Sequence, residues 1–248
     1  MTGLLLALVA GAVVGLALGG LGGGGSVLAV PALIYLLGFT PAEATTASLV
    51  IVALTSVTAL TGHARDGNVA WRTGLLFAAA GIVPAMLAGA AADHLPQPVL
   101  TAAFAVIAGL AALRMLRPAP TEPSGPLVRP GKAGAAGAGL GAVTGFLGVG
   151  GGFLAVPALV GVLGLAMRTA MGTSLLVISL NSLAALIARA GTGTHLDWSV
   201  ISPFTGAAIL GAWDGRRLAK KTEGETLQRV FACVLLAVAA CMLVDALV

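Results

Sequence analysis

Two glycine-rich segments of this chain have the residues best suited to hold a small anion. The first reads GGLGGGGSVLAVPAL from Gly19 to Leu33, and the second reads GFLGVGGGFLAVPAL from Gly145 to Leu159. Glycine permits a break in a helix, and the helix that follows a break begins with free backbone N–H groups. Such N-termini carry partial positive charge and bind anions. Two of them aimed at one point would form an anion site built from backbone donors.

Hydroxyl and amide side chains follow each glycine segment at equivalent positions, 126 residues apart. Ser48 corresponds to Ser174, and Thr55 corresponds to Asn181, seven residues further along the same helix face. Such neutral donors hold an anion without the cost of a buried charge. The expected substrate-binding residues are Gly22, Gly24, Gly25, Ser26, Thr46, Ser48, Thr55, Gly150, Gly151, Gly152, Thr173, Ser174 and Asn181, with Pro31 and Pro157 as structural supports.

The same residues also have a purely structural interpretation. Small residues such as glycine let helices approach closely inside a membrane, and Ser and Thr form hydrogen bonds between membrane helices. For a single glycine run this interpretation would be preferred. The occurrence of two equivalent runs, each followed by LAVPAL, favours a site.

The composition indicates an all-α membrane protein. Of 248 residues, 58% are hydrophobic and 9% are charged, whereas soluble domains carry about 25% charged residues. The uncharged stretches have about the length of a membrane span or fall slightly short of it. We expect a multi-pass protein integral to the cytoplasmic (inner) membrane, without a removable signal peptide. The six stretches are Ala44–Thr61, Leu75–Ala92, Val99–Leu113, Ala170–Ala188, Ser199–Trp213 and Val230–Val244.

The chain divides into two repeats joined by a linker. Between residues 19–49 and 145–175, 16 of 31 positions are identical, which indicates descent from one unit. The proline-rich stretch between the halves is incompatible with a lipid-exposed span. We therefore expect a first membrane repeat at 1–116, a cytoplasmic linker at 117–132 and a second membrane repeat at 133–248. Each repeat would hold one glycine hairpin and three transmembrane helices, giving seven or eight hydrophobic segments.

The positions of the basic residues predict how the repeats are oriented. Cytoplasmic loops collect Lys and Arg, so the loop at 63–72, the linker and the cluster at 216–221 should lie inside. The counterparts of the first and last of these, near 189–198 and 93–94, would then lie outside, so the halves are expected to be inverted, as in many secondary transporters. Both termini are predicted outside. The net charge of +4 is thus interpreted as a topology signal, and no nucleic-acid partner is expected.

The glycine hairpins are expected to be short. Only about 14 apolar residues flank the glycines of the second segment on either side, or about 21 Å of helix against a core of about 30 Å. A broken or re-entrant hairpin fits this length. Two thin full spans satisfy the same topology and remain an alternative.

Other chemistry finds little support in the sequence. Thr40, Pro41 and Glu43 have the spacing of a helix cap, so Glu43 is interpreted as a capping residue rather than as a proton carrier. Asp214 is expected to form an interfacial ion pair, and the three histidines are placed near the surfaces. A Gly-x-Gly-x-x-Gly match begins at Gly20, but no strand precedes it. No cofactor or metal site is predicted.

The duplicated GGGGSVLAVPAL and GVGGGFLAVPAL, each followed by a helix that carries Ser-Leu at Ser48 and Ser174, resemble the TauE/SafE sulfite exporter family of membrane permeases. The resemblance covers essentially the whole chain. It implies movement of sulfite, sulfonates or related organosulfur anions. It also implies that Gly22, Gly24, Gly25, Gly150, Gly151, Pro31, Pro157, Ser48, Thr173 and Ser174 form the site and its supports. The first half has Ala47 where the family pattern has threonine.

We therefore expect a secondary transporter, not an enzyme, that moves a small anion by alternating access. An anion-selective channel is the first alternative, since re-entrant hairpins also build selectivity filters. A non-transporting membrane subunit or an intramembrane enzyme is less favoured. The expected partners are the anion, a coupling proton or sodium ion, and the lipid bilayer. The sequence makes no prediction of substrate identity, flux direction or oligomeric state.

Overall fold

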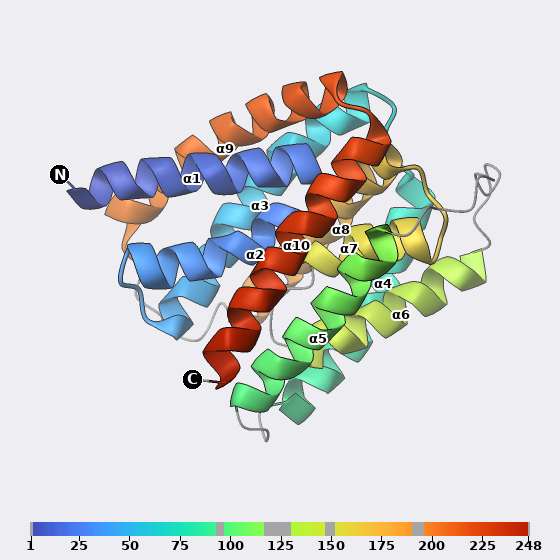
Figure 1. The fold of residues 1–248 in the computed structure, drawn as a ribbon, viewed down its shortest axis with the longest axis horizontal. Helices are drawn as coiled ribbons and strands as arrows, with labels where there is room; N and C mark the ends of the chain where they lie inside the picture. Colours follow the sequence, from blue (N-terminus) through green and yellow to red (C-terminus); the bar gives the residue numbers. More distant parts are fainter. Residues whose placement is uncertain (1, 93–96, 117–129, 147–151, 190–195, 248) are drawn as a thin grey trace.

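The computed structural model describes residues 2–92, 97–116, 130–146, 152–189 and 196–247 (Figure 1). Within these ranges the chain forms ten α-helices and one short π-helix, and no strand. The elements are α1 (Thr2–Leu21), α2 (Gly24–Pro31), η1 (Ala32–Leu36), α3 (Pro41–Arg65), α4 (Trp71–Ala92), α5 (Gln97–Leu116), α6 (Pro130–Phe146), α7 (Gly152–Gly161), α8 (Met167–Arg189), α9 (Trp198–Lys221) and α10 (Gly224–Leu247).

The helices confirm the all-α membrane class. Each of the six uncharged stretches lies within one helix, in the order α3, α4, α5, α8, α9 and α10. Among the described residues, five helices are long and apolar enough to cross a membrane: α1, α3, α4, α8 and α10. The first three residues of α6, from Pro130 to Lys132, fall inside the predicted linker, so that helix begins earlier than expected. The rest of the linker lies outside the described residues.

The most extensive helix interface joins α1 of the first half to α9 of the second (Figure 1). Glycines on α1 face backbone on α9. A Cβ on Gly15 would overlap the backbone of Ala208, and a Cβ on Gly19 would overlap that of Ala212. Contacts of this kind require glycine because a side chain has no space. The two helices therefore run side by side in the same direction.

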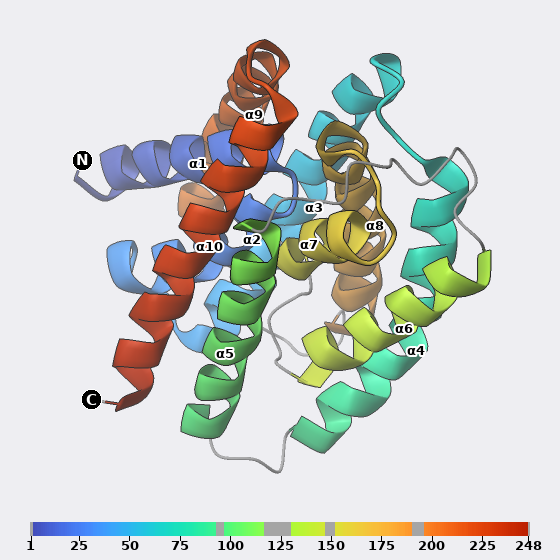
Figure 2. The ribbon, with the colours of Figure 1, turned by 45° about the vertical axis from the view of Figure 1, so that its right-hand side comes forward.

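The second most extensive interface, between α4 and α6, has the same construction with the halves exchanged (Figure 2). Gly137 on α6 faces the backbone of Phe77 on α4, and Gly141 faces that of Gly81. Gly137 and Gly141 are the counterparts of Gly11 and Gly15, and Gly11 faces the backbone of Phe204, the counterpart of Phe77. In each half, therefore, the first helix packs against a helix of the other half.

Two further pairs join equivalent helices, and both are antiparallel. The end of α3 meets the start of α8, since a Cβ on Gly172 would lie 3.2 Å from the Cβ of His63. At the opposite end of the pair, Arg189 donates to the hydroxyl of Thr46 at 3.3 Å. Gln228 at the start of α10 donates to the carbonyl of Met115 near the end of α5. The α5–α10 pair lies along one side of the molecule (Figure 2).

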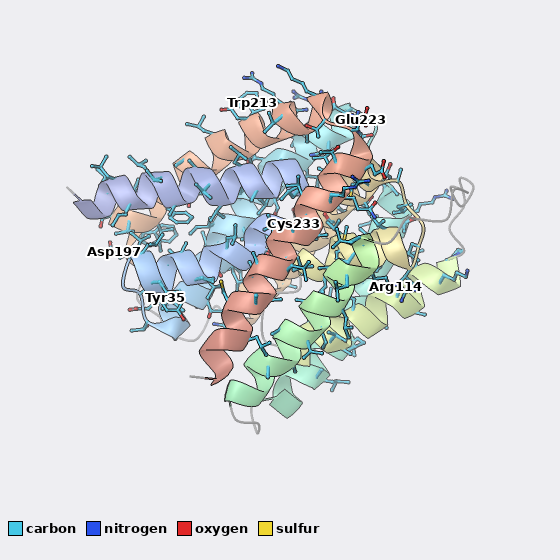
Figure 3. All side chains as sticks on the ribbon, in the orientation of Figure 1. Tyr35, Arg114, Asp197, Trp213, Glu223 and Cys233 are labelled. Atoms are coloured by element: carbon cyan, nitrogen blue, oxygen red, sulfur yellow. The ribbon has the colours of Figure 1, made fainter. Side chains whose placement is uncertain are left out.

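The first glycine hairpin has one long arm and one short arm. α1 has 20 residues, about 30 Å of helix, whereas the arms of the second hairpin are expected to measure about 21 Å. α2 has eight residues and runs back along α1, because Gly25 packs against Leu18 and the carbonyl of Val14. Tyr35 in η1 therefore lies at the end of the molecule that holds the N-terminus, as does Asp197 before α9 (Figure 3). A short returning arm fits the re-entrant prediction.

Prolines shape both short helices. Pro31 is the last residue of α2, and the π-helix η1 begins directly after it. Pro157 lies inside α7, which has ten residues. Proline lacks a backbone N–H and cannot complete the helical ladder. In η1, the i→i+5 pattern of a π-helix accommodates the break.

The predicted cap of α3 is confirmed. The Thr40 hydroxyl accepts from the N–H of Glu43 at 3.4 Å, and the Glu43 carboxylate accepts from the Thr40 N–H at 3.0 Å. Pro41 occupies the first helical turn. These contacts assign Glu43 to the start of α3, as the sequence predicted.

Candidate functional site

Gly22 forms the turn of the first hairpin and touches the second half of the chain. Its φ of +73° lies in the left-handed region, which glycine adopts without strain. A Cβ at this position would lie 2.7 Å from the Ser174 hydroxyl oxygen and 3.0 Å from the Met171 Cα. The turn between α1 and α2 is therefore packed against the hydroxyl-bearing face of α8.

The starts of α2 and α7 also meet. A Cβ on Gly152, the first residue of α7, would lie 2.7 Å from the hydroxyl oxygen of Ser26, in the first turn of α2. Gly152 and Ser26 are counterparts in the two repeats, so this contact joins one position to its own equivalent. The Ser26 hydroxyl donates to the Gly23 carbonyl at 2.7 Å, and no side chain caps α2. Two helix N-termini thus lie next to each other.

The predicted hydroxyls on α3 and α8 are buried, and each donates within its own helix. Ser48 donates to the Thr45 carbonyl at 2.8 Å, and Thr55 donates to the Ile51 carbonyl at 2.6 Å. Ser174, which is fully buried, donates to the Met171 carbonyl at 2.7 Å. Because a hydroxyl has one proton, none of the three can donate to an anion in this conformation. Redirecting one proton gives up a bond worth about 0.5–1.5 kcal/mol.

Two predicted threonines lie at opposite ends of the α3–α8 pair. Thr46 donates to the Ala42 carbonyl at 3.0 Å and accepts from Arg189. Thr173 accepts from the backbone N–H of Ala70 at 3.0 Å, which attaches the segment before α4 to α8. Through these contacts both threonines hold other parts of the fold in place.

The predicted set is therefore only partly assembled. Gly22, Ser26, Gly152 and Ser174 meet where the halves touch, whereas Gly25 packs inside its own hairpin. Gly24 begins α2, and Gly150 and Gly151 lie outside the described residues. Asn181 has a buried side-chain oxygen without a hydrogen-bond partner.

Ser56 and Ser179 form a direct hydrogen bond that sequence reasoning missed. Their hydroxyl oxygens lie 2.9 Å apart, between α3 and α8, and both side chains are buried. Ser56 lies eight residues after Ser48, two turns along the same helix face. Following the hydroxyl residues along this face of α3 from Ser48 by two turns would have identified Ser56.

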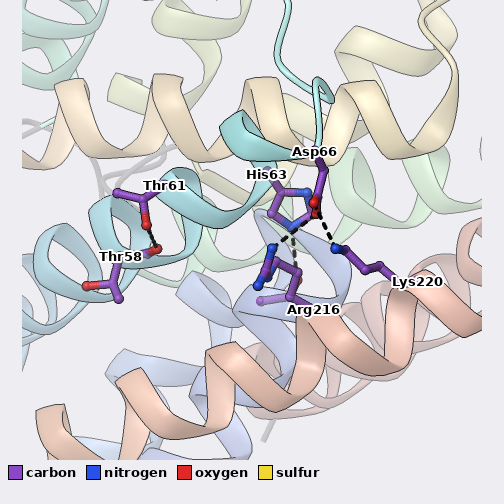
Figure 4. Close-up of polar contacts among 7 residues, drawn as sticks. Thr58, Thr61, His63, Asp66, Arg216 and Lys220 are labelled. Carbon is purple, nitrogen blue, oxygen red and sulfur yellow. Dashed lines mark hydrogen bonds and ion pairs between the residues drawn. The ribbon is translucent and has the colours of Figure 1, made fainter.

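An ionic cluster joins the end of α3 to α9 (Figure 4). Asp66 accepts from Lys220 at 2.7 Å and from Arg216 at 3.1 Å. The Lys220 ammonium holds the pKa of Asp66 below its usual value, with Arg216 acting in the same direction. The contact brings the loop at 63–72 and the basic cluster at 216–221 to the same end of the molecule. Asp214 pairs with Arg217 at 3.5 Å, as expected of an interfacial ion pair.

His63 lies beside this cluster and is buried, with 4% of its surface exposed (Figure 4). The sequence predicted a position near a membrane surface, at the end of a span, but it did not predict this burial. The end of α3 is enclosed by the end of α1, the start of α8 and α9, because Gly172 has no side chain to hold α8 away. The Nε2 atom donates to the Gly19 carbonyl at 3.3 Å, and Nδ1 is buried without a partner.

The described residues contain no group of His, Cys, Asp or Glu side chains that could hold a metal ion. The predicted site residues contribute hydroxyls, one amide and the starts of α2 and α7. Such groups are hydrogen-bond donors and acceptors, suited to an anion held without a counter-charge.

Comparisons with known proteins agree on the class of the molecule. The family model described as "Sulfite exporter TauE/SafE" matches residues 7–242. The chain is 35% identical over 246 residues to a "Probable membrane transporter protein" of Xylella fastidiosa (strain 9a5c), covering 95% of this chain and 93% of that relative. A protein of the same name from the Temecula1 strain is 34% identical with the same coverage.

Proposed function

Because the chain belongs to the sulfite exporter TauE/SafE family of membrane transporters, we propose that it is a secondary transporter of a small sulfur-containing anion. The expected substrates are sulfite, sulfonates and related organosulfur compounds. Transport would proceed by alternating access around α2 and α7, the two short helices that start at glycine.

The contact between the starts of α2 and α7 carries this proposal. Ser26 and Gly152 are in contact, so the first turns of both helices are adjacent, and the leading N–H groups of a helix have no partner within it. Their partial positive charges attract an anion, and neutral donors do so without a permanently buried charge. Ser174, which packs against Gly22, would add a hydroxyl once its proton turns away from the Met171 carbonyl.

The paired contacts of the two halves support alternating access. The α1–α9 interface recurs as α6–α4, as expected if a two-fold axis exchanges the halves. α3 and α8 are exchanged by that axis and run antiparallel, so the axis would be perpendicular to both helices. Because both helices are candidate spans, the axis would lie in the membrane plane. We infer that the repeats are inverted, an arrangement that permits two equivalent conformations of opposite access.

The proposal is tested first by ligand stabilisation and then by flux. Detergent-purified protein is melted with sulfite, sulfate, thiosulfate, sulfoacetate, taurine, phosphate or chloride. A ligand at 100 times its dissociation constant adds about 2.7 kcal/mol of stability. A selective shift with one sulfur anion is expected. Absence of any shift, together with no flux in proteoliposomes, would overturn the assignment to sulfur anions.

Counterflow separates a transporter from a channel. Proteoliposomes loaded with unlabelled substrate should accumulate labelled substrate transiently against its gradient, because an alternating-access site exchanges one anion for another. A channel equilibrates the label without accumulation and without saturation. Non-saturating flux would therefore replace the transporter proposal with the channel.

The orientation of the chain in the membrane remains a prediction. With the loop at 63–72 and the cluster at 216–221 on the cytoplasmic side, both termini lie outside. A cysteine introduced at an exposed residue of the cluster, such as Lys221, should be protected from impermeant thiol reagents in intact cells. Labelling of that cysteine in intact cells would show that the chain has the opposite orientation.

A further inference from the structure

His63 combines burial with an unused protonation site. It is 4% exposed, and its Nε2 atom donates to the Gly19 carbonyl at 3.3 Å. A carbonyl only accepts, so the proton of the neutral ring is on Nε2 and Nδ1 carries a free lone pair. Nδ1 is buried and has no hydrogen-bond partner. The ring can therefore accept one proton without breaking its existing bond.

Two positive side chains and one carboxylate lie around the buried His63. Arg216 and Lys220 act on it from α9, and Asp66 acts on it from the end of its own helix. α1 contributes the Gly19 carbonyl and α8 contributes Gly172, neither of which is ionisable. Two positive groups thus face one carboxylate, and that carboxylate is bonded to both of them. A third positive charge is disfavoured, whereas a bound anion would offset it.

The proposed anion site lies close to His63 along two helices. Gly19 is three residues before Gly22, and Gly172 is two residues before Ser174. At 1.5 Å per residue, each step is about 3–5 Å along the helix axis. His63 contacts α1 at Gly19 and α8 at Gly172. Gly22 and Ser174, the other residue of each pair, contact each other. We call the place where Gly22, Ser26, Gly152 and Ser174 come together the meeting point. The charge of an anion bound there would lie close to the imidazole ring of His63.

We propose that His63 takes up a proton on Nδ1 when the anion binds, so that one proton crosses the membrane together with the anion. The proton comes from the aqueous phase to which the site is open, and it leaves to the other phase when the anion leaves. This inference rests on the proposed anion transport and adds the coupling ion to it.

At the equivalent position, the second half has a different residue. The counterpart of His63 is Arg189, which bonds to the Thr46 hydroxyl. A guanidinium keeps its proton at all working pH values. One titratable position in one half therefore leads us to expect one proton per transport cycle.

The test separates proton movement from anion movement. Wild-type protein is reconstituted in liposomes that contain a pH-sensitive dye, and inward gradients of radiolabelled thiosulfate or isethionate are applied. Both probes remain fully ionised over the working pH range, so neither carries a proton itself. Labelled anion should enter and the lumen should acidify. Anion entry without acidification overturns the inference and leaves the proposed function standing, whereas no entry of either probe counts against both.

The variant His63→Gln assigns the proton to the residue. The Gln amide can still donate to the Gly19 carbonyl but cannot take up a proton. Acidification should fall to the level of protein-free liposomes while anion exchange persists. His94→Gln and His195→Gln are the matched controls and should acidify the lumen as the wild type does. Full acidification by His63→Gln would overturn the assignment, and if that variant fails to fold, the wild-type dye experiment still decides whether a proton moves.

Discussion

Glycines occur both in the α1–α9 interface and at the meeting point of α2 and α7, but the atoms that lie against these glycines differ between the two places. On α1, the glycines face backbone atoms of α9, as at Gly15 against Ala208. At the meeting point, the hydroxyl oxygens of Ser174 and Ser26 would be the nearest atoms to a Cβ on Gly22 and on Gly152, followed by the backbone of Met171 and the side chain of Ile178. Backbone cannot move without moving a helix, whereas a hydroxyl can rotate.

This difference separates the two interpretations of glycine in this chain. The interfaces α1–α9 and α4–α6 need glycine for close packing, as small residues provide in membranes. The glycines at the meeting point have polar neighbours from the opposite half, which packing alone does not require. We infer that the first group builds the rigid frame and the second group belongs to the site that changes during transport.

The largest expected effect is in the frame. Gly15→Val places a branched side chain where a Cβ alone would overlap the backbone of Ala208. Overpacking in a closely packed interface costs about 1–3 kcal/mol or more, and here α1 and α9 must separate. The variant should lose most of its folded, monodisperse protein in size-exclusion chromatography, and its remaining fraction should melt at a much lower temperature.

Gly139→Ala is the matched control on the other first helix. Gly139 lies on α6, and nothing lies within 4 Å of a Cβ added there. Its counterpart in α1 is Val13, which is exposed. Alanine favours helix over glycine by about 1 kcal/mol, so this variant should be as stable as the wild type or slightly more stable. Equal behaviour of both variants would remove the distinction between frame glycines and free glycines.

The repeat and the turn of the first hairpin could be predicted from the sequence, because identity at a constant offset and a run of glycines are visible without coordinates. The turn of the second hairpin lies outside the described residues. The cap at Thr40 and Glu43 and the pair of Asp214 with Arg217 were also predictable, since both are local. The burial of His63 was not predicted, because it depends on α1, on α9 and on the absence of a side chain at Gly172.

The remaining misses have the same origin. Asp66 and Lys220 lie 154 positions apart, and no sequence pattern pairs them. The prediction placed five hydroxyl residues of α3 and α8 in one site: Thr46, Ser48, Thr55, Thr173 and Ser174. The antiparallel arrangement instead sends Thr46 and Thr173 to opposite ends of the pair, where Arg189 and Ala70 bond to them. Periodicity in the sequence predicts which residues share one face of a helix, but it does not predict which other helix packs against that face.

The second prediction tests the meeting point by exchanging its two residues. Gly152→Ser alone brings a second side chain against Ser26 and against Ile178, whose Cγ1 atom would lie 2.8 Å from the new Cβ. This should lower stability by about 1–3 kcal/mol and abolish anion flux while membrane insertion persists. Adding Ser26→Gly removes one obstacle and should restore part of the loss.

A double-mutant cycle gives the measure of that contact. Ser26→Gly, Gly152→Ser and their combination are melted and assayed in proteoliposomes. Residues in contact show coupling of about 0.5–3 kcal/mol, whereas independent residues are additive within about 0.3–0.5 kcal/mol. Additive losses would mean that the starts of α2 and α7 do not meet in the folded protein.

The third prediction concerns the polar contact between α3 and α8. Ser179→Ala removes the partner of the Ser56 hydroxyl, 2.9 Å away, in a buried position. Ser56 keeps the Ala53 carbonyl at 3.2 Å, so its hydroxyl is not left alone. The expected loss is about 1 kcal/mol of stability, the usual value of one hydrogen bond. Thermal melts of Ser179→Ala, Ser56→Ala and the double variant should show less than additive losses, and full additivity would contradict the bond.

The smallest expected effect is at the ionic cluster, outside the glycine contacts. Asp66 bonds to Lys220 and Arg216, and its side chain is 21% exposed. Because its pKa is lowered from 3.8 in the folded protein, its stabilisation is fully present above pH 3.8 and is lost as the pH falls through the folded pKa. Asp66→Asn should therefore be less stable than wild type near neutral pH, by up to about 1 kcal/mol for a partly exposed pair.

The difference between Asp66→Asn and wild type should shrink in acid, because the protonated aspartic acid no longer attracts Lys220. Asp214→Asn is the control, since Asp214 and Arg217 are 70% and 67% exposed and such pairs contribute little. Melting curves of the three proteins from neutral pH to below 3.8 decide the point. A deficit of Asp66→Asn that stays constant with pH would assign the role of Asp66 to hydrogen bonding alone. A deficit that disappears in acid shows that charge fastens α9 to the end of α3, next to His63.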